Sequence, residues 1–275
     1  MTTEVVRPKL SLAALAADLN LRKNVILAAT LALMDTRLRY RRTTLGPFWV
    51  TLSTGLTVLS VGFIFGQIFD APSGKGQPGY MPYVTTGFVI WSFISASILE
   101  GCTVFVSSAP LIKALHVPIV IHVMRMLARN VILLAHNAIL IVLLWIFLQW
   151  HVGWETVLVI PGLVLMAAGV VGVVLTLSVL CTRYRDIPPI VQAFMQLMFL
   201  ITPILWPSSN LKGGWANLIL ELNPVYNLME VVRGPLLGTI VPLSVWISAF
   251  VTASVSLVLG LWFFRAYQHR LPYWV

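Results

Sequence analysis

A few charged and polar residues lie inside otherwise apolar stretches, and they are the best candidates for chemistry in this chain. His122, Arg125, Arg129 and His136 are spaced by 3, 4 and 7 residues. On a helix this spacing places them within an arc of roughly 60°. Glu100 lies in the preceding apolar stretch. Charges in such surroundings are costly unless they are paired or used. Two interpretations follow: a structural pair between Glu100 and Arg125, or a cationic stripe that guides an anionic substrate head.

The sequence contains no set of residues typical of an enzyme. The histidines form no ligand set, and the two cysteines, Cys102 and Cys181, lack metal-site spacing. The G-x-G-x-x-G letters at Gly74–Gly79 follow no strand and open no helix, and we interpret them as a flexible turn. No phosphate-binding G-x-x-x-x-G-K-[ST] loop occurs. We therefore expect no catalytic residue, metal or cofactor in this chain, and any ATP must be bound elsewhere.

Apolar composition defines the elements that must position these residues. Of 275 residues, 59% are hydrophobic and 10% are charged, and the mean hydropathy is +0.91. An ordinary soluble enzyme and a disordered chain are both excluded, because soluble domains carry about 25% charged residues. Six stretches reach the roughly 20 residues needed to span a membrane as helices. They are Phe48–Phe69, Tyr83–Val106, Ile119–Leu148, Val157–Cys181, Pro189–Trp206 and Leu243–Ala266.

The basic residues are distributed unevenly between the two sides of this predicted all-α membrane protein. Fifteen of the 18 Lys and Arg residues fall on one side, and Lys75, Lys212 and Arg233 fall on the other. Positive residues mark cytoplasmic loops, so both termini are predicted to be cytoplasmic. The net charge of +9 thus reflects topology, with attraction to anionic membrane lipids, and indicates no nucleic-acid partner.

Three segments outside the spans have predicted roles. Residues 1–47 form a cytoplasmic segment with an amphipathic interface helix, and residues 48–275 form the six-span domain. Residues 107–118 contain Pro110 and Pro118, which bracket either a short helix or a plain loop. Residues 207–242 are predicted to be re-entrant, with two short pieces, Trp215–Leu222 and Val225–Val232, broken at Asn223-Pro224. Glu230 and Arg233 are predicted to pair at i,i+3 spacing.

Aromatic residues inside the spans and near the re-entrant pieces are candidates for a conduit. Such rings either stack on sugar faces or simply pack in the core and against lipid, and both interpretations stay open. With the two arginines of the stripe, the channel-lining candidates are Phe88, Trp91, Arg125, Arg129, Phe194, Phe199, Trp206 and Tyr226.

Three motifs carry a resemblance to a known family. The first, Arg37–Trp49, reads RLRYRRTTLGPFW; the second is Arg183–Pro188 with Gln192 and Thr202-Pro203-Ile204; the third is Asn223-Pro224 with Tyr226 and Glu230–Arg233. The chain resembles the membrane (permease) subunits of polysaccharide and polyol-phosphate ABC exporters, of the O-antigen, capsule or teichoic acid type, within the type-2 ABC membrane-domain family.

The resemblance implies an assembly in the bacterial inner membrane. Two copies of the chain would form the conduit for a lipid-linked glycan, and two ABC ATPase subunits would bind ATP and Mg. The segment between spans two and three would be a coupling helix, with ATPase contacts from Leu111, Ile112, Lys113, Leu115 and His116. The 207–242 pieces would be outer gate helices. Substrate phosphate would enter at Arg37, Arg39, Arg41 and Arg42, which equally suit simple positive-inside anchoring.

Two other functions compete with this interpretation. The chain could be the permease of another type-2 exporter that moves a lipid or a drug. It could also be an integral membrane enzyme or an ion-coupled carrier, although clustered catalytic residues and internal repeats are both lacking.

Overall fold

The computed structural model describes residues 21–69, 79–114, 117–150, 153–208 and 220–275. Every regular element within these residues is a helix. In chain order they are α2 (Leu21–Arg39), α3 (Phe48–Phe69), α4 (Tyr80–Ser107), α5 (Ala109–Ala114), α6 (Val120–Leu148), η1 (Trp154–Leu158), α7 (Val159–Arg183), α8 (Ile187–Ile201), α10 (Pro224–Leu236), α11 (Leu243–Tyr267), η3 (Gln268–Arg270) and α12 (Leu271–Trp274).

Five helical stretches among the described residues are long and apolar enough to cross a membrane. They are α3, α4, α6, η1 with α7, and α11 with its continuation to Trp274. The predicted fifth span is shorter than expected, because α8 ends at Ile201 after 15 residues and the chain bends through residues 202–206. Pro203 explains the end: a proline disfavours helical backbone at the residue before it, and Thr202 is extended.

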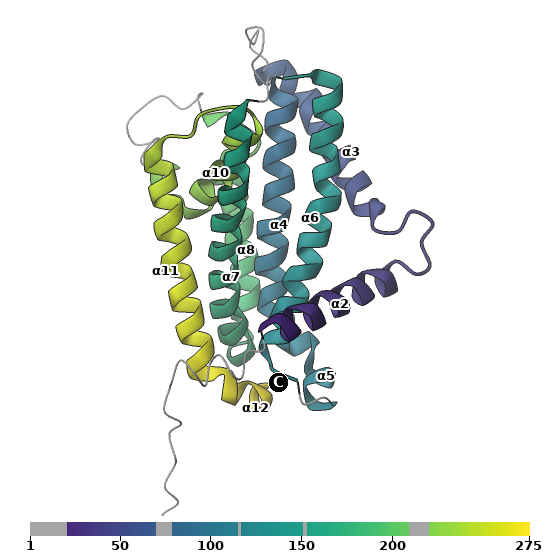
Figure 1. The fold of residues 1–275 in the computed structure, drawn as a ribbon, viewed down its shortest axis with the longest axis vertical. Coiled ribbons are helices and arrows are strands. Elements are labelled where there is room, and N and C mark those ends of the chain that lie inside the picture. The colour runs from purple at the N-terminus through teal and green to yellow at the C-terminus, as the bar shows by residue number, and fades with distance from the viewer. Residues whose placement is uncertain (1–20, 70–78, 115–116, 151–152, 209–219) are drawn as a thin grey trace, which may run out of the picture.

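The spanning helices form a bundle around α4, which contacts α3, α6, α7, α8 and α10, while α7 also packs along α11 (Figure 1). Helices α5 and α12 lie at the lower end in Figure 1, and α2 crosses the bundle obliquely near this end. We call it the α5 end. Helix α10 lies towards the opposite end, which we call the α10 end, and contacts η1.

Glycines allow α7 and α11 to approach until their backbones touch. A Cβ atom added to Gly172 would lie 2.2 Å from the carbonyl carbon of Ser256, and one added to Gly260 would lie 2.3 Å from the oxygen of Gly172. The Ser256 hydroxyl also donates to the Gly169 oxygen at 3.2 Å. Small residues that permit such contact are a common basis of helix association in membranes. Gly172 and Gly260 therefore permit the backbone contact between α7 and α11.

Small residues, and not the leucines, form the face of α2 that packs on the bundle. The helical stripe of Leu27, Leu31, Met34 and Leu38 is largely exposed, with Leu38 at 66% exposure. The buried residues are instead Ala28, Ala32 and Thr36, on the face towards α6. Small side chains let α2 lie close to α6. The larger apolar side chains are therefore free to contact lipid.

Candidate functional site

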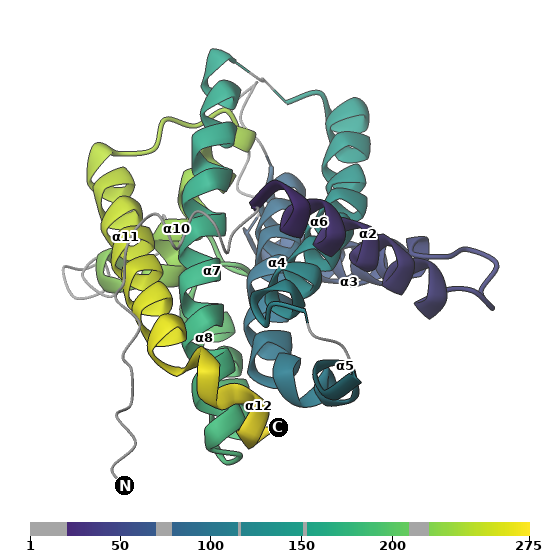
Figure 2. The same cartoon turned by 60° about the horizontal axis from the view of Figure 1, so that its bottom comes forward.

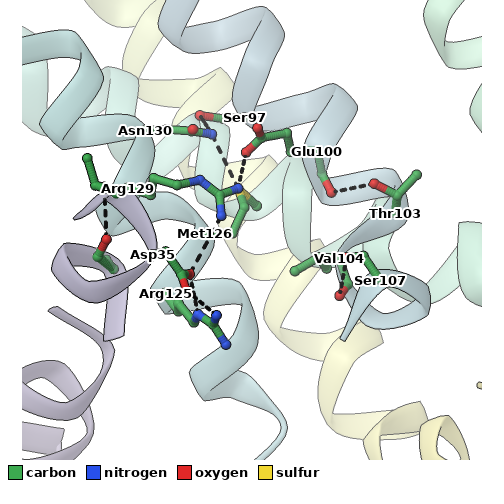
Figure 3. Close-up of polar contacts among 12 residues, drawn as sticks. Asp35, Ser97, Glu100, Thr103, Val104, Ser107, Arg125, Met126, Arg129 and Asn130 are labelled. Carbon is green, nitrogen blue, oxygen red and sulfur yellow. Dashed lines mark hydrogen bonds and ion pairs between the residues drawn. The ribbon is translucent and has the colours of Figure 1, made fainter. Parts of the chain in front are cut away.

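Two arginines of α6 join three helices through ion pairs near the α5 end (Figure 3). Arg125 donates from Nε and Nη2 to the two carboxylate oxygens of Asp35 on α2. Arg129 donates from Nη2 to Oε2 of Glu100 on α4 at 2.6 Å. Its Nη1 lies 3.8 Å from Oδ2 of Asp35. The two pairs therefore attach α2 and α4 to successive turns of α6.

The predicted Glu100–Arg125 pair is wrong, because Glu100 pairs with Arg129, one helical turn further along α6. The sequence does not reveal that α2 packs on the start of α6 and brings Asp35 to Arg125. A bidentate carboxylate is a strong partner for a guanidinium, and it leaves Arg125 no need of Glu100.

A cavity of about 710 Å³ lies beside these ion pairs, between α2, α4, α5 and the start of α6. Its charged lining comes from Asp35, Arg39, Glu100, Arg125 and Arg129. The rest is lined by Thr103, Val104, Ser107, Ser108, Pro110, Leu111, His122 and Met126. The three arginines outnumber the two carboxylates, so the cavity carries an excess of positive charge when His122 is neutral.

The remaining polar residues of α6 contact α4 or α3. Asn130 donates to Ser97 Oγ at 3.3 Å, and Asn137 donates to Ser92 Oγ at 3.4 Å. Nδ1 of His136 donates to the backbone oxygen of Ile132 on the same helix, and the His136 ring packs edge-on against Phe48. The stripe predicted on α6 thus faces α2, α3 and α4.

A second hollow, an open groove of about 520 Å³, lies between α4 and α8. Trp91 and Phe199 form its aromatic part, with ring centroids 5.6 Å apart. Its other lining residues are Ser95, Leu99, Gln192, Met195, Gln196 and Leu200. Aromatic rings next to amide groups suit a ligand that has both apolar and hydroxyl surface, as a sugar does. We call this hollow the α4–α8 groove.

The channel-lining candidates do not gather at one place. Trp91 and Phe199 line the α4–α8 groove, and Phe88 packs edge-on against Phe199 at 5.6 Å. Phe194 is exposed on α8, the Trp206 indole donates to the Leu200 oxygen, and Tyr226 lies on α10. Arg125 and Arg129 line the polar cavity instead. The cavity and the groove lie on opposite faces of α4, because Glu100 follows Trp91 by nine residues, which is half a turn beyond two full turns.

A fully buried arginine holds α10 against the bend that follows α8. Arg233 is 0% exposed, and its Nε donates to Oε2 of Glu230 at 2.9 Å, which confirms the predicted i,i+3 pair. Its Nη1 donates to the Pro203 oxygen. The guanidinium lies over the ring of Tyr83 on α4, 4.3 Å from the centroid. One side chain therefore connects α10, α4 and the bend.

The carbonyl groups of the bend are bonded by side chains of α4. Tyr83 donates its hydroxyl to Pro203 at 2.8 Å and to Trp206 at 3.1 Å, and Tyr80 donates to Leu205 at 2.6 Å. Asn223, the N-cap of α10, also donates to Thr202 Oγ at 3.0 Å. Irregular backbone at membrane depth requires such partners.

The arginines before α3 are exposed, and they differ in position. Arg37 and Arg39 end α2, whereas Arg41 and Arg42 lie in the turn that leads to α3. Only Arg39 of the four lines the polar cavity. The turn ends at Gly46, whose φ of +57° lies in the left-handed region that glycine tolerates.

The predicted coupling residues are partly described. Leu111 and Ile112 are half-buried on α5, and Lys113 is exposed in its last turn. Leu115 and His116 lie outside the described residues, as do residues 74–78 and most of the predicted Trp215–Leu222 piece.

Comparison with known proteins identifies the family to which this architecture belongs. Residues 28–237 match the model of a family described as ABC-2 type transporter. The chain belongs to this family. An O-antigen export system permease protein RfbA from Klebsiella pneumoniae is 24% identical over 244 residues, which cover 86% of this chain and 90% of the relative. A protein of the same name from Myxococcus xanthus is 24% identical over 205 residues, covering 74% and 77%.

Membership assigns the chain a role in transport. An ABC-2 permease is a multi-pass membrane subunit that associates with an ABC ATPase, so ATP hydrolysis falls to the partner. The resemblance drawn from the three motifs is thereby confirmed at the level of the type-2 permease family.

Two features of this ABC-2 permease were missed by the reasoning from its sequence. Asp35 is the one acidic residue of α2, and its position within an apolar helix was the available signal. Cys102 and Cys181 are far apart in the chain, yet both are buried where α4 packs on α7. No local pattern predicts that contact.

Proposed function

We propose that this ABC-2 permease exports a polysaccharide such as O-antigen, carried on a lipid, across the bacterial inner membrane. Two copies form the conduit, and two ABC ATPase subunits drive it. The α4–α8 groove is the observation that carries the proposal, because rings at Trp91 and Phe199 lie next to the amides of Gln192 and Gln196. The names of the two relatives support the same substrate class.

The distribution of charge supports an orientation with the α5 end in the cytoplasm. Lys113 on α5, Arg183 at the end of α7 and Arg265 near the end of α11 all lie at that end. Arg233 is the basic residue of α10 and is buried. Cytoplasmic segments are the ones enriched in Lys and Arg.

This orientation requires six crossings. The described chain starts on α2 and ends on α12, both near the α5 end (Figure 2). Five crossings would leave its ends on opposite sides. On this orientation, the return from the end of α7 towards the start of α11 would be made by α8 and the bend at 202–206. We propose that these form the sixth crossing and the re-entrant gate.

Export of a lipid-linked glycan requires a place where the phosphate head enters, and we assign it to the turn before α3. Arg41 and Arg42 are exposed there, followed by the exposed rings of Phe48 and Trp49. Cations next to aromatic residues at a membrane surface suit a phosphate head with an apolar tail.

The test is surface glycan export in a deletion strain that carries variants of this chain. Reversal of charge at Arg41→Glu with Arg42→Glu is expected to abolish export while the complex with the ATPase still assembles. The matched control is Arg265→Glu with Arg270→Glu, which reverses two charges at the same end and is expected to retain export. Normal export by the Arg41/Arg42 variant would contradict the head-group role.

A second experiment tests whether the exported glycan contacts the α4–α8 groove. Trp91→Ala is expected to slow export by roughly tenfold, taking the 1–3 kcal/mol known for stacking of nucleic-acid bases on an aromatic ring as a guide. Phe264→Ala, which also removes a buried aromatic ring but outside the groove, is the control. Equal export by the two variants, measured as surface glycan per cell, would move the conduit away from this groove.

A further inference from the structure

The polar cavity contains hydrogen-bonding groups that the described chain does not satisfy. His122 is 2% exposed and lines the cavity, and neither of its ring nitrogens has a hydrogen-bond partner among the described residues. Nε of Arg129 is likewise without a partner there. Buried polar groups are nearly always bonded, so a cavity lined by such donors points to a ligand.

The charge of the lining selects an anion. Arg39, Arg125 and Arg129 face two carboxylates, and both carboxylates already accept hydrogen bonds from α6 arginines. A metal ion would have to displace those arginines. No group of three His, Cys, Asp or Glu suited to a metal occurs in the described part of the chain. Arginine donors favour phosphate, which they bind through their planar fork of N–H groups.

The position of the cavity indicates that the anion belongs to a lipid. Helix α2, which forms one wall, crosses the bundle near the α5 end (Figure 2). Its outer face carries exposed apolar side chains, which are Val25, Ile26, Leu27, Leu33, Met34 and Leu38. A helix with such a face lies at the boundary between acyl chains and head groups. Arg39, at the end of α2, is exposed and lines the cavity at that boundary.

We propose that the cavity between α2, α4, α5 and α6 binds the phosphate of an anionic membrane lipid, with donors from His122, Arg39 and Nε of Arg129. This site lies on the face of α4 opposite the α4–α8 groove, and the proposal does not depend on what the permease exports. A lipid bound here would contact both α2 and the residue Leu111 of α5, and so would influence the element next to the ATPase.

The experiment uses the full permease purified with its ATPase partner in detergent. Phosphatidylglycerol, phosphatidylcholine and inorganic phosphate are added separately, and the unfolding temperature and bound lipid are measured. Binding to the folded state raises the unfolding temperature. We expect phosphatidylglycerol to raise it, and the other two additives to have little effect.

The decisive variant is His122→Leu. It breaks no hydrogen bond, because the His122 ring has no partner in the described chain. The unliganded variant complex is therefore expected to be at least as stable as the unliganded wild type. Affinity for phosphatidylglycerol is expected to fall roughly tenfold, as for loss of one hydrogen bond to a charged group. His136→Leu is the matched control, since this histidine lies on the same helix outside the cavity.

Three results would overturn the proposal. Retention of the phosphatidylglycerol effect in His122→Leu would remove the cavity as its site. An equal shift with phosphatidylcholine would remove the requirement for an anionic lipid. An equal shift with inorganic phosphate would replace the lipid with a soluble anion. Failure of glycan export in the Arg41/Arg42 variant leaves all three readouts intact, so the two proposals are tested separately.

Discussion

Arg129 of α6 and Glu100 of α4 form an ion pair 2.6 Å long between two membrane helices, with 16% and 32% of their side chains exposed. The pair lies a helical turn beyond the residue that sequence alone assigns to Glu100. Because Asp35 lies 3.8 Å from the same guanidinium, Arg129 has a second carboxylate in reach.

Glu100→Gln is expected to destabilise the permease modestly. The change leaves Arg129 with a weaker neutral acceptor and the distant Asp35, and a partly exposed pair loses roughly 1–2 kcal/mol. Urea or thermal unfolding in detergent measures the loss. The double variant Glu100→Gln with Arg129→Gln should lose less stability than the sum of the two single variants, because the energy of the pair is then counted once. If the losses of the two single variants simply add, the pair does not act as described.

Asp35→Asn is expected to loosen α2 from α6 while the rest of the bundle stays intact. Asp35 accepts both hydrogen bonds of Arg125, and the remaining contact of α2 consists of small residues that bury little area. Hydrogen exchange should rise in residues 21–39 alone. Asp186→Asn, an exposed acid at the start of α8, is the control and should leave that exchange unchanged.

Arg233→Met is expected to cost about 3–5 kcal/mol, the range for breaking a buried pair. It would leave Glu230 without its partner and the Pro203 carbonyl with only the Tyr83 hydroxyl. The stability of Arg233→Lys should lie between those of the wild type and Arg233→Met, since lysine keeps the charge but loses the planar stacking on Tyr83. Thermal unfolding ranks the three proteins, and a lysine variant as poor as methionine would contradict a role for the charge.

Gly172→Ala adds only one methyl group, yet it is expected to lower the stability of the permease strongly. The new methyl would lie 2.2 Å from the Ser256 backbone, so α7 and α11 must separate. Gly55→Ala adds the same atom next to the flexible Leu140 side chain, 3.2 Å away, and should be tolerated. Unfolding temperatures of both variants decide the matter, and equal values would mean that the two helices separate at little cost.

The spans were largely predictable because their signal is local. Phe48–Phe69 was predicted to the residue, since a run of apolar residues needs only its own composition to define a membrane helix. The end of α8 at Ile201 could not be predicted in this way, because the apolar stretch continues through Pro203 to Trp206. Apolar residues alone do not reveal that side chains of α4 and α10 stabilise a non-helical backbone at this point.

The candidate sites were less predictable, because they depend on which helices meet. Intramembrane arginines could be recognised as paired or functional, but their partners follow from the packing of α2 on α6. The contact face of α2 is set by the same packing, and its large apolar residues are the exposed ones. In a membrane the larger apolar side chains can face lipid, and alanine can face protein.

The bend at 202–206 has a consequence for how the protein is made. Its carbonyl groups are bonded by Tyr80 and Tyr83, already synthesised, and by Arg233, some thirty residues later in the chain. A translocon that released α8 into lipid on its own would expose unsatisfied backbone groups to hydrocarbon. We therefore expect α8 to insert stably only together with α10, with the two helices entering the bilayer as one unit against α4.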